Sequence, residues 1–271
     1  MKKKSPSVAV MISTYNWKEA LRICLRGVLD QTVLPDEIVI ADDGSRPDTA
    51  AFIREMQRVS PVPIVHVWHE DAGFRRTIIL NKAIALVKSD YILQIDGDVV
   101  PARHFVADHL ELAEPGYFVC GSRVKLTKEA TEKIFSGGRL RPCFFSLPLG
   151  YALNTLRSRL LRSYLAGRYA RSIDHLRGCN MAFWRSDLLR VNGYNEDLLE
   201  WGHEDGELAF RLHFAGVGKK ALKMGGAVFH LYHKEASRGN EQRHIDELEH
   251  VKSNRIAWCK NGIDKYLSLQ S

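Results

Sequence analysis

Short apolar runs rich in β-branched residues alternate, over the first 121 residues, with segments of helical length. The runs are VAVMI (8–12), EIVIA (37–41), PIVHVW (63–68), YILQI (91–95) and YFVCG (117–121). Helices are expected over 48–59, 77–88 and 102–113, and another after Asn16, a suitable N-cap with Glu19 in the capping-box position. This order predicts an α/β fold with a mainly parallel sheet flanked by helices over about residues 7–121.

The alternation fails after residue 121, and the rest of the chain divides into three further segments. A basic, partly helical insert without clear strands is expected over 122–177, and a smaller acceptor-side region over 178–240. The last segment, 241–271, has the pattern of a polar C-terminal helix. Within the insert, the leucines and tyrosines of 151–172 recur near one helical face, which predicts an amphipathic helix there.

The positive charge of the chain is concentrated in one part of that insert. Residues 139–177 contain eight arginines and one acid, Asp174, so their formal charge equals the +7 of the whole chain. A field confined to one segment suggests an anionic surface met by one face. The charge alone leaves open membrane phospholipid, nucleic acid or an acidic glycolipid as that surface.

Cysteine usage and hydropathy indicate the compartment. The five cysteines are odd in number and widely spaced, without a CxxC pair, which argues against a disulfide framework and a zinc site. The apolar run near the N-terminus is too short for a signal-peptide core, and no run approaches the roughly 18 apolar residues that span a bilayer. We therefore expect a cytoplasmic protein, soluble or peripheral on the inner face of the membrane.

Polar clusters directly follow three of the expected strands. They are STYN (13–16), DDGS (42–45) and DGD (96–98). In open α/β sheets, ligands bind beyond the carboxyl ends of the strands, so these clusters are expected to meet in space. The first strand is not followed by GxGxxG, and GxxxxGK[ST] is absent, so dinucleotide and P-loop sites are disfavoured.

The DGD cluster is the strongest of the three. Residues two apart in a strand face the same side, so Asp96 and Asp98 are expected to point into one small volume. A divalent cation would offset their mutual repulsion. The structural alternative is an ordinary turn at the strand exit, because Asp-Gly is a common turn dipeptide.

Three later segments carry further candidate groups. Arg75 and Arg76 open a helix-like run, where planar guanidinium groups could hold a base or a pyrophosphate, although a solvated pair is an equally ordinary arrangement. WGHED (201–205) precedes an amphipathic helix; its acids either stabilise that helix end or supply a base for a sugar hydroxyl. His230 and His233 would face opposite ways in an extended segment, so only one would reach a metal.

Taken together, these motifs resemble the family 2 glycosyltransferases, which are inverting enzymes of the GT-A fold. The resemblance covers nearly the whole chain and rests on six ordered motifs. They are VMISTYNW, IVIADDGS, DAGFRRTIILNKAI, LQIDGDVVP, RGCNMAFWR and WGHEDGELAFRL. The second half resembles the galactosyltransferase-type C-terminal module of bacterial polymer synthases of the chondroitin type. The fold implied is a Rossmann-like sheet with a nucleotide-sugar-binding half over 1–121 and a smaller acceptor-side region.

The resemblance implies a set of nucleotide contacts. Thr14 and Tyr15 would form walls of the nucleotide site, and Asp43 would contact the uracil edge. Arg75 matches the family's basic residue near the base, and Asp96 would contact ribose or metal-bound water. A UDP sugar is the expected donor.

The resemblance also implies the metal and the base. Asp98 and His233, with Asp96, would hold Mn²⁺ or Mg²⁺, and the imidazole ligand favours Mn²⁺. Asp205 would be the catalytic base, with Glu204 supporting it. One carboxylate is sufficient for in-line, inverting transfer.

On the acceptor side, the resemblance places Gly178 and Asn180 in the donor-sugar pocket and makes Trp201, beside Gly202, a platform for the acceptor. One departure puts the diphosphate contacts in doubt, because Leu80 stands where many relatives carry an arginine. The acceptor is expected to be a saccharide or a lipid-linked saccharide in bacterial cell-surface polysaccharide or lipopolysaccharide synthesis. Nucleic acid is then not an expected partner, and the arginines of 139–177 suggest contact with an anionic membrane.

Two other functions fit parts of the sequence. An Asp-x-Asp phosphatase or phosphotransferase would also use paired aspartates, but Val99 and Val100 stand where such sites usually have a hydroxyl residue. A non-catalytic carbohydrate-binding protein on a decayed transferase fold is disfavoured, because every expected catalytic residue type is present. Donor sugar, linkage and oligomeric state are not encoded in any motif.

Overall fold

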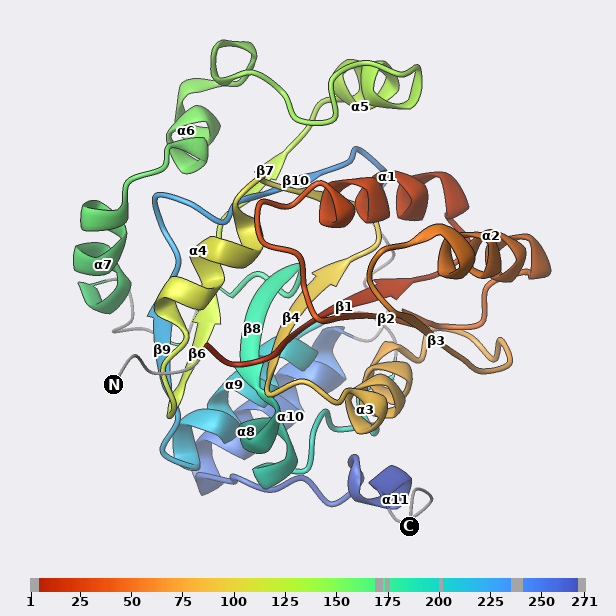
Figure 1. The fold of residues 1–271 in the computed structure, drawn as a ribbon. Helices are drawn as coiled ribbons and strands as arrows, with labels where there is room; N and C mark the ends of the chain where they lie inside the picture. The colour runs from red at the N-terminus through yellow and green to blue at the C-terminus, as the bar shows by residue number, and fades with distance from the viewer. Residues whose placement is uncertain (1–4, 169–172, 174–175, 200–201, 235–240, 268–271) are drawn as a thin grey trace.

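The protein is an α/β structure in which helices cover both faces of one large sheet (Figure 1). The computed structural model describes residues 5–168, 173, 176–199, 202–234 and 241–267. In this part of the chain, seven strands form the large sheet in the order β3-β2-β1-β4-β8-β6-β9. They are β1 (Val8–Thr14), β2 (Glu37–Asp42), β3 (Ile64–Trp68), β4 (Tyr91–Asp96), β6 (Tyr117–Cys120), β8 (Asn180–Trp184) and β9 (Gly218–Ala221).

The strands β3, β2, β1 and β4 are all parallel, as the alternating pattern predicts. The prediction differs from the structure beyond β4. The next strand is β8, which comes from the region after the basic insert and pairs antiparallel with both β4 and β6. A strand drawn from the expected acceptor-side region therefore lies in the middle of the sheet, because its apolar residues are covered on both faces.

Helices flank this sheet in two layers, seen above and below it in Figure 1. The longer helices are α1 (Lys18–Leu29), α2 (Pro47–Val59), α3 (Arg76–Leu86), α4 (Phe105–Leu112), α5 (Lys128–Phe135), α7 (Arg159–Arg168), α9 (Glu204–Phe214) and α10 (Glu241–Asn254). The shorter ones are α6 (Leu149–Ala152), α8 (Arg185–Arg190), α11 (Asp264–Leu267), and the 3-10 turns η1 (Phe144–Ser146) and η2 (Leu153–Thr155). None of the described helices is long and apolar enough to cross a membrane.

Side chains alternate along the strands of the large sheet, so each of its two faces has a hydrophobic core of its own. In β1, Val10 and Ile12 pack with α1, α2 and α4, whereas Ala9 and Met11 pack with α3, α8 and α9. Because both faces are covered, the central strands read as continuous apolar runs. The carboxyl ends of β1, β2 and β4 are thus held rigidly at one edge of the sheet.

A second sheet of three strands extends this edge. It consists of β5 (Val99–Pro101), β10 (Val228–His230) and β7 (Arg123–Lys125), in that order. The antiparallel pairing of β10 with β5 sets His230 opposite Val99, and the Leu231 N–H donates to the Asp98 carbonyl oxygen at 2.9 Å. The pairing brings residues around 230 beside the DGD turn, although more than 100 residues separate them in the chain.

The first helix begins differently from the sequence prediction. Its N-cap position is Trp17, and no side chain caps it. Asn16 adopts a φ of 48° and binds the turn after β2 instead: its N–H donates to Ser45 Oγ at 2.8 Å, and its Oδ1 accepts from the Arg46 N–H at 2.9 Å. The asparagine therefore links the segments that follow β1 and β2 instead of capping the helix.

The predicted amphipathic helix over 151–172 is broken in the structure. The chain forms α6 and η2, becomes extended at Leu156, and begins α7 only at Arg159. The break allows Arg162 to insert between Asp108 and Glu111, at 2.7 Å from each. The positions 169–172 lie outside the described residues. The insert also contains a strand, β7, that its sequence pattern does not indicate.

Candidate active site

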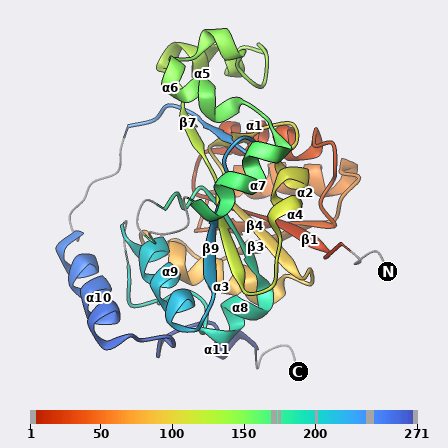
Figure 2. The ribbon, with the colours of Figure 1, turned by 90° about the vertical axis from the view of Figure 1, so that its left-hand side faces the viewer.

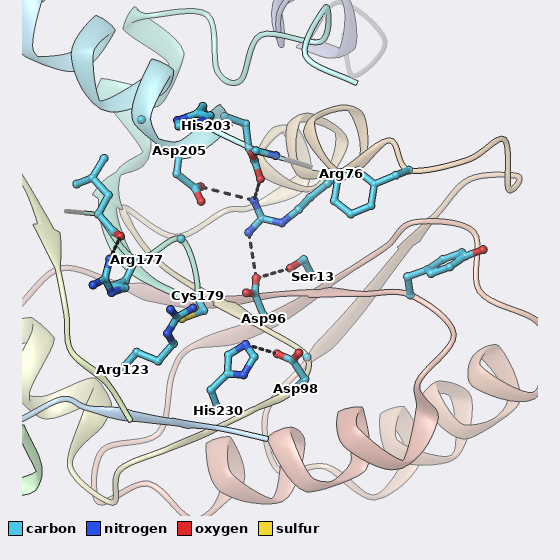
Figure 3. A pocket seen from close by; sticks show the side chains of 18 of the residues that line it. Ser13, Arg76, Asp96, Asp98, Arg123, Arg177, Cys179, His203, Asp205 and His230 are labelled. Atoms are coloured by element: carbon cyan, nitrogen blue, oxygen red, sulfur yellow. Dashed lines mark hydrogen bonds and ion pairs between the residues drawn. The ribbon is translucent and has the colours of Figure 1, made fainter. Parts of the chain in front are cut away.

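A cleft of about 1130 Å³ opens at the carboxyl ends of β1, β2 and β4. It is closed on the other side by the start of α9 and by the segment after β10. Figure 3 shows acids, arginines and a histidine from these separate elements pointing into this cleft. All three polar clusters that follow the strands contribute to its lining. The convergence expected from the sequence is therefore present.

Asp98 and two histidines form a compact group at one end of the cleft. His233 Nε2 lies 3.2 Å from Asp98 Oδ2, and His230 Nε2 lies 3.6 Å from Asp98 Oδ1. One ligand atom from each of the three residues lies within 4.8 Å of the others. The expectation that only one histidine reaches this point is wrong, because the extended strand ends at His230 and the chain then turns.

Asp98 is an acid kept ionised in a buried place. Burial acts to raise its pKa, but the hydrogen bond from His233 and the charge of His230 outweigh burial, so the pKa is lowered. The same hydrogen bond raises the pKa of His233. Asp98 Oδ1 is buried and has no hydrogen-bond partner among the described residues. A buried carboxylate oxygen without a partner, facing two imidazoles, fits a divalent cation with mixed oxygen and nitrogen ligands.

Asp96 reaches the same cleft but has different partners. Its Oδ1 accepts from Ser13 Oγ at 3.0 Å and from Arg76 Nη2 at 3.0 Å. Asp96 does not belong to the group of three that could hold a metal directly. The two aspartates of the DGD turn thus have different partners: Asp96 contacts Ser13 and Arg76, whereas Asp98 contacts the two histidines.

Arg76 joins the two halves of the cleft. Besides Asp96, its guanidinium approaches Glu204 Oε1 at 3.1 Å and Asp205 Oδ1 at 3.5 Å. These carboxylates come from the end of β4 and the first turn of α9. Burial opposes the charge of Arg76, but Asp205, Asp96 and Glu204 together raise its pKa well above the usual value. Figure 3 shows the side chain at the centre of this arrangement.

Asp205 has a pKa raised into the range of a general base. Burial is the main cause, Glu204 and Asp96 add to it and Arg76 opposes it, with the result that the pKa is raised to about 6. Oδ1 of Asp205 accepts from the Tyr194 hydroxyl at 3.1 Å and from Gln94 Nε2 at 3.4 Å. Oδ2 faces Gly178, where an added Cβ would lie 1.7 Å from it.

Asp43 is held rigidly at the opposite end of the cleft. Its Oδ1 faces His69 Nε2 at 2.7 Å, and its Oδ2 accepts from the Arg75 N–H at 2.9 Å. Thr14 and Tyr15 line the cleft beside it. The Tyr15 hydroxyl donates to Asp71 Oδ2 at 2.9 Å, and that hydrogen bond is the largest cause of the raised pKa of Tyr15.

Most of the site residues expected from the sequence meet in this cleft. They are Thr14, Tyr15, Asp43, Asp96, Asp98, Gly178, Gly202, Glu204, Asp205 and His233. Two do not line it. The Arg75 guanidinium donates to the Glu70 carbonyl, and Asn180 is fully buried, bonded to His109 and to the carbonyls of Ser122 and Gly226. Trp201 lies outside the described residues.

Some side chains that line this cleft were not given a role of their own from the sequence, among them Ser13, Arg76, Arg123 and His230. Ser13 belongs to the STYN cluster and Arg76 to the arginine pair at the start of α3, and the sequence did not decide which residue of each motif faces the cleft. A signal for His230 was present in its spacing from His233. Arg123 lies on β7, a three-residue strand that exists only through its pairing with β10.

Similar solved structures identify the class of fold. The mannosyltransferase PcManGT from Pyrobaculum calidifontis, in complex with GDP-Man and Mn²⁺, aligns over 99% of this chain and 70% of its own with a TM-score of 0.62 and 20% identity. Residues 1–349 of TarS from S. aureus, in complex with UDP, align over 97% of this chain and 70% of their own with a TM-score of 0.63 and 14% identity. The chain has the GT-A fold of these glycosyltransferase structures.

The sequence places the chain within that class. The model of glycosyl transferase family 2 matches residues 9–190, and a second model, described as the N-terminal domain of galactosyltransferase, matches residues 160–234. The chain therefore belongs to glycosyl transferase family 2.

The curated relatives are longer than this chain. Chondroitin synthase of Escherichia coli is 24% identical over 84% of this chain and 34% of its own length. Validoxylamine A glucosyltransferase of Streptomyces hygroscopicus subsp. limoneus is 27% identical over 78% of this chain and 49% of its own. This chain thus spans about a third to a half of the length of these two relatives.

Proposed function

We propose that the chain is an inverting glycosyltransferase that moves a hexosyl or N-acetylhexosaminyl group from a nucleotide sugar to a hydroxyl of a saccharide acceptor. The observation that carries the proposal is one cleft containing both a carboxylate of raised pKa, Asp205, and the Asp98, His230 and His233 group. A UDP sugar is the proposed donor, with support from the UDP complex of TarS. Chondroitin synthases among the relatives support a bacterial cell-surface polysaccharide or lipopolysaccharide as the product.

The nucleotide would lie between the ends of β1 and β2. Asp43 is positioned by His69 and the Arg75 N–H, so its remaining lone pairs can accept from the imide N–H of uracil. Tyr15 is half exposed beside it and can stack on the base. Because both oxygens of Asp43 are fixed, the site favours a base that offers a donor at this one point. Arg75 contributes through its backbone in this arrangement.

The diphosphate end of the donor would meet the Asp98 group. Asp98, His230 and His233 would hold Mn²⁺ or Mg²⁺, and two imidazole ligands favour Mn²⁺. When bound, such an ion supplies Lewis-acid stabilisation of the negative charge on the departing nucleoside diphosphate. Asp96 does not coordinate in this proposal; it holds Arg76 by its ion pair. The Mn²⁺ in the PcManGT complex supports this choice of ion.

Asp205 would remove the proton from the acceptor hydroxyl. Tyr194 and Gln94 donate to its Oδ1, which leaves Oδ2 free to face the acceptor past Gly178. A pKa of about 6 keeps the group ionised at neutral pH while leaving it basic enough to accept a proton. Glu204 acts through Arg76 by sharing its charge. Attack from the side opposite the diphosphate inverts the anomeric centre, so one carboxylate is sufficient.

The acceptor would enter between Gly178 and the start of α9, beside Gly202, with Trp201 as a proposed stacking surface. The wall there includes Phe210, Ile245 and Leu248. An aliphatic and aromatic wall fits the apolar face of a sugar ring or of a linked lipid.

All five cysteines are free thiols, four of them buried, which supports a reducing, cytoplasmic site of action.

Two variants separate the proposed roles. Isothermal titration of UDP in the presence of Mn²⁺ should give unchanged affinity for Asp205→Asn and no metal-dependent binding for Asp98→Ala. Transfer to an acceptor should fall by about 10²–10⁴ in Asp205→Asn, the range of a lost general base. Asp246→Ala is a matched control, because Asp246 is exposed and lies outside the cleft.

Near-normal transfer by Asp205→Asn would refute the role of the base. UDP affinity in Asp98→Ala equal to that of the unmodified protein would refute the metal site. Metal-dependent phosphate release from a simple ester, without hydrolysis of any sugar nucleotide, would favour a phosphotransferase instead.

A further inference from the structure

The helix α7 is folded with its apolar side outward. Leu160 is 86% exposed and Tyr164 is 64% exposed, whereas Arg162 between them is fully buried. Leu160 and Tyr164 are four residues apart, so they lie in one row on the outer face. Ala166, four residues after Arg162, is buried on the inner face. This is the reverse of the usual pattern for a surface helix.

Ion pairs of Arg162 fix this orientation. Its guanidinium contacts Asp108 and Glu111 of α4, and it donates to the Met224 carbonyl oxygen at 3.2 Å. Rotating α7 to bury Leu160 would expose the pairs on α4 and leave Asp108 short of a partner. Buried charges that lose a partner are costly, so the outward apolar face is a fixed feature of the fold.

The apolar exposure continues along the chain before α7. Phe145 in η1 is 91% exposed and Leu149 in α6 is 71% exposed, with Leu153 and Leu156 partly exposed between α6 and α7. We call residues 144–168 the arm. In Figure 2 the helices of the arm, α6 and α7, lie on the side of the molecule that faces the viewer, away from α2 and α3. Large protruding apolar side chains along one segment are typical of an interaction surface.

The charges of the arm identify its partner. Arg139, Arg159 and Arg168 are exposed, and residues 139–168 contain no acidic side chain. Arg157 and Arg162 are held by Asp108 of α4, and Arg141 by Asp30, which follows α1. Arg159 contacts Glu111 of α4 at 3.7 Å and Arg168 donates to the Tyr164 hydroxyl at 3.0 Å. Both side chains remain exposed, as does that of Arg139 just before the arm, so all three can contact an anionic partner beside the apolar row. Protruding apolar side chains with flanking arginines match the boundary between headgroups and acyl chains of a bilayer.

We propose that the arm docks on an anionic phospholipid surface, with Phe145, Leu149, Leu160 and Tyr164 entering the headgroup region. The arginines would contact lipid phosphates. A second copy of the chain fits less well, because a two-fold interface would bring together arginines of both copies with no acid of the arm between them. The proposal goes beyond the transferase activity, and its test requires no turnover.

Flotation with lipid vesicles tests the proposal directly. The protein should float with vesicles of phosphatidylcholine and phosphatidylglycerol at low ionic strength and much less with phosphatidylcholine alone. The triple variant Phe145→Ser, Leu160→Ser, Tyr164→Ser should lower the partition coefficient about a thousandfold, since each of the three buried side chains contributes about tenfold. Arg159→Gln should lower it by about fivefold.

Matched controls lie on α2, which is on the opposite side of the molecule from α7 in Figure 1. Val59 is 69% exposed there and Arg58 is exposed beside it, so Val59→Ser and Arg58→Gln make the same chemical changes away from the arm. Neither should change the partition coefficient. Circular dichroism melting verifies that each variant is folded, as expected for substitutions of exposed side chains.

Three results would overturn the proposal. The first is no flotation with the anionic vesicles at low ionic strength. The second is equal flotation of the triple variant and the unmodified protein. The third is a dimer in light scattering that the triple variant converts to a monomer, which would assign the arm to a second copy of the chain.

Discussion

Replacing Asp205 by asparagine should make the protein more stable while it abolishes the proposed activity. In the folded protein, burial raises the pKa of Asp205 to about 6 from its ordinary value of 3.8. The folded state therefore binds the proton more tightly than the unfolded chain, and ionisation of Asp205 destabilises the fold. Asparagine has the same shape and no charge, so it removes that penalty.

The size of the effect follows from the difference between the two pKa values. About two pKa units correspond to about 3 kcal/mol at most. The side chain is 18% exposed, and its 3.5 Å contact with Arg76 is weakened in the variant, so we expect about 1 to 3 kcal/mol. Arg76 keeps Asp96 and Glu204 as partners, which limits the loss.

The dependence on pH distinguishes this explanation from a general packing effect. The pKa of Asp205 is higher in the folded protein than in the unfolded chain. The free energy of unfolding of the unmodified protein therefore falls as the pH rises from about 4 to about 6, and above that range the full cost of the buried charge is present. Denaturant unfolding should show Asp205→Asn more stable than the unmodified protein at about pH 8, with the difference falling to roughly a third of that size at about pH 4.5.

A second aspartate, whose pKa is lowered instead of raised, gives a control. Asp48 is exposed at the start of α2, and a hydrogen bond from Lys18 lowers its pKa. Asp48→Asn should therefore not stabilise the protein at any pH. If Asp205→Asn were destabilising at about pH 8, or stabilising by the same amount at both pH values, the assignment of a destabilised base would be refuted.

Two further variants test how the cleft and the arm are built. Gly178→Ala should reduce transfer at least about tenfold with UDP affinity retained, because the new Cβ would displace Asp205 Oδ2. Gly167→Ala, at a glycine with open space around it, is the control. Unchanged transfer by Gly178→Ala would contradict the proposed geometry. Arg162→Met should lower the free energy of unfolding by about 3 kcal/mol, because the buried Asp108 loses one partner; the loss is limited because Arg157 and the Gly226 N–H still hold Asp108. Denaturant titration measures this loss. A loss below about 1 kcal/mol would contradict the proposed anchoring of α7.

Sequence reasoning predicted the parallel half of the sheet because each of its strands is short, apolar and bounded by polar turns. The runs at 8–12, 37–41, 63–68 and 91–95 correspond to β1, β2, β3 and β4, with differences of one or two residues at their ends. The position of β8 between β4 and β6 was not predictable in this way. Pairing between strands separated by a long insert depends on which edges remain available after the sheet forms.

The residues of the candidate site likewise fall into those that the sequence could predict and those that it could not. Asp96, Asp98 and Asp205 could be selected because each stands directly beyond an apolar strand or before a helix, where side chains meet at a sheet edge. Arg75 and Arg76 could not be distinguished, because a rotation of one residue at the start of α3 decides which guanidinium enters the cleft. The insert shows the same limit: its apolar periodicity was evident, but not the direction in which α7 would face.

The sequence by itself thus determined the local elements and the kinds of side chain that stand at their ends, because apolar periodicity and turn chemistry act over a few residues. Only the tertiary structure decided the partners. It paired β10 with β5 so that both His230 and His233 face Asp98, and it placed Arg76 among three acids. All of these contacts except that of Arg76 with Asp96 join residues more than a hundred positions apart. They exist because burying the apolar faces of the sheets leaves the polar ends of the strands together at one edge.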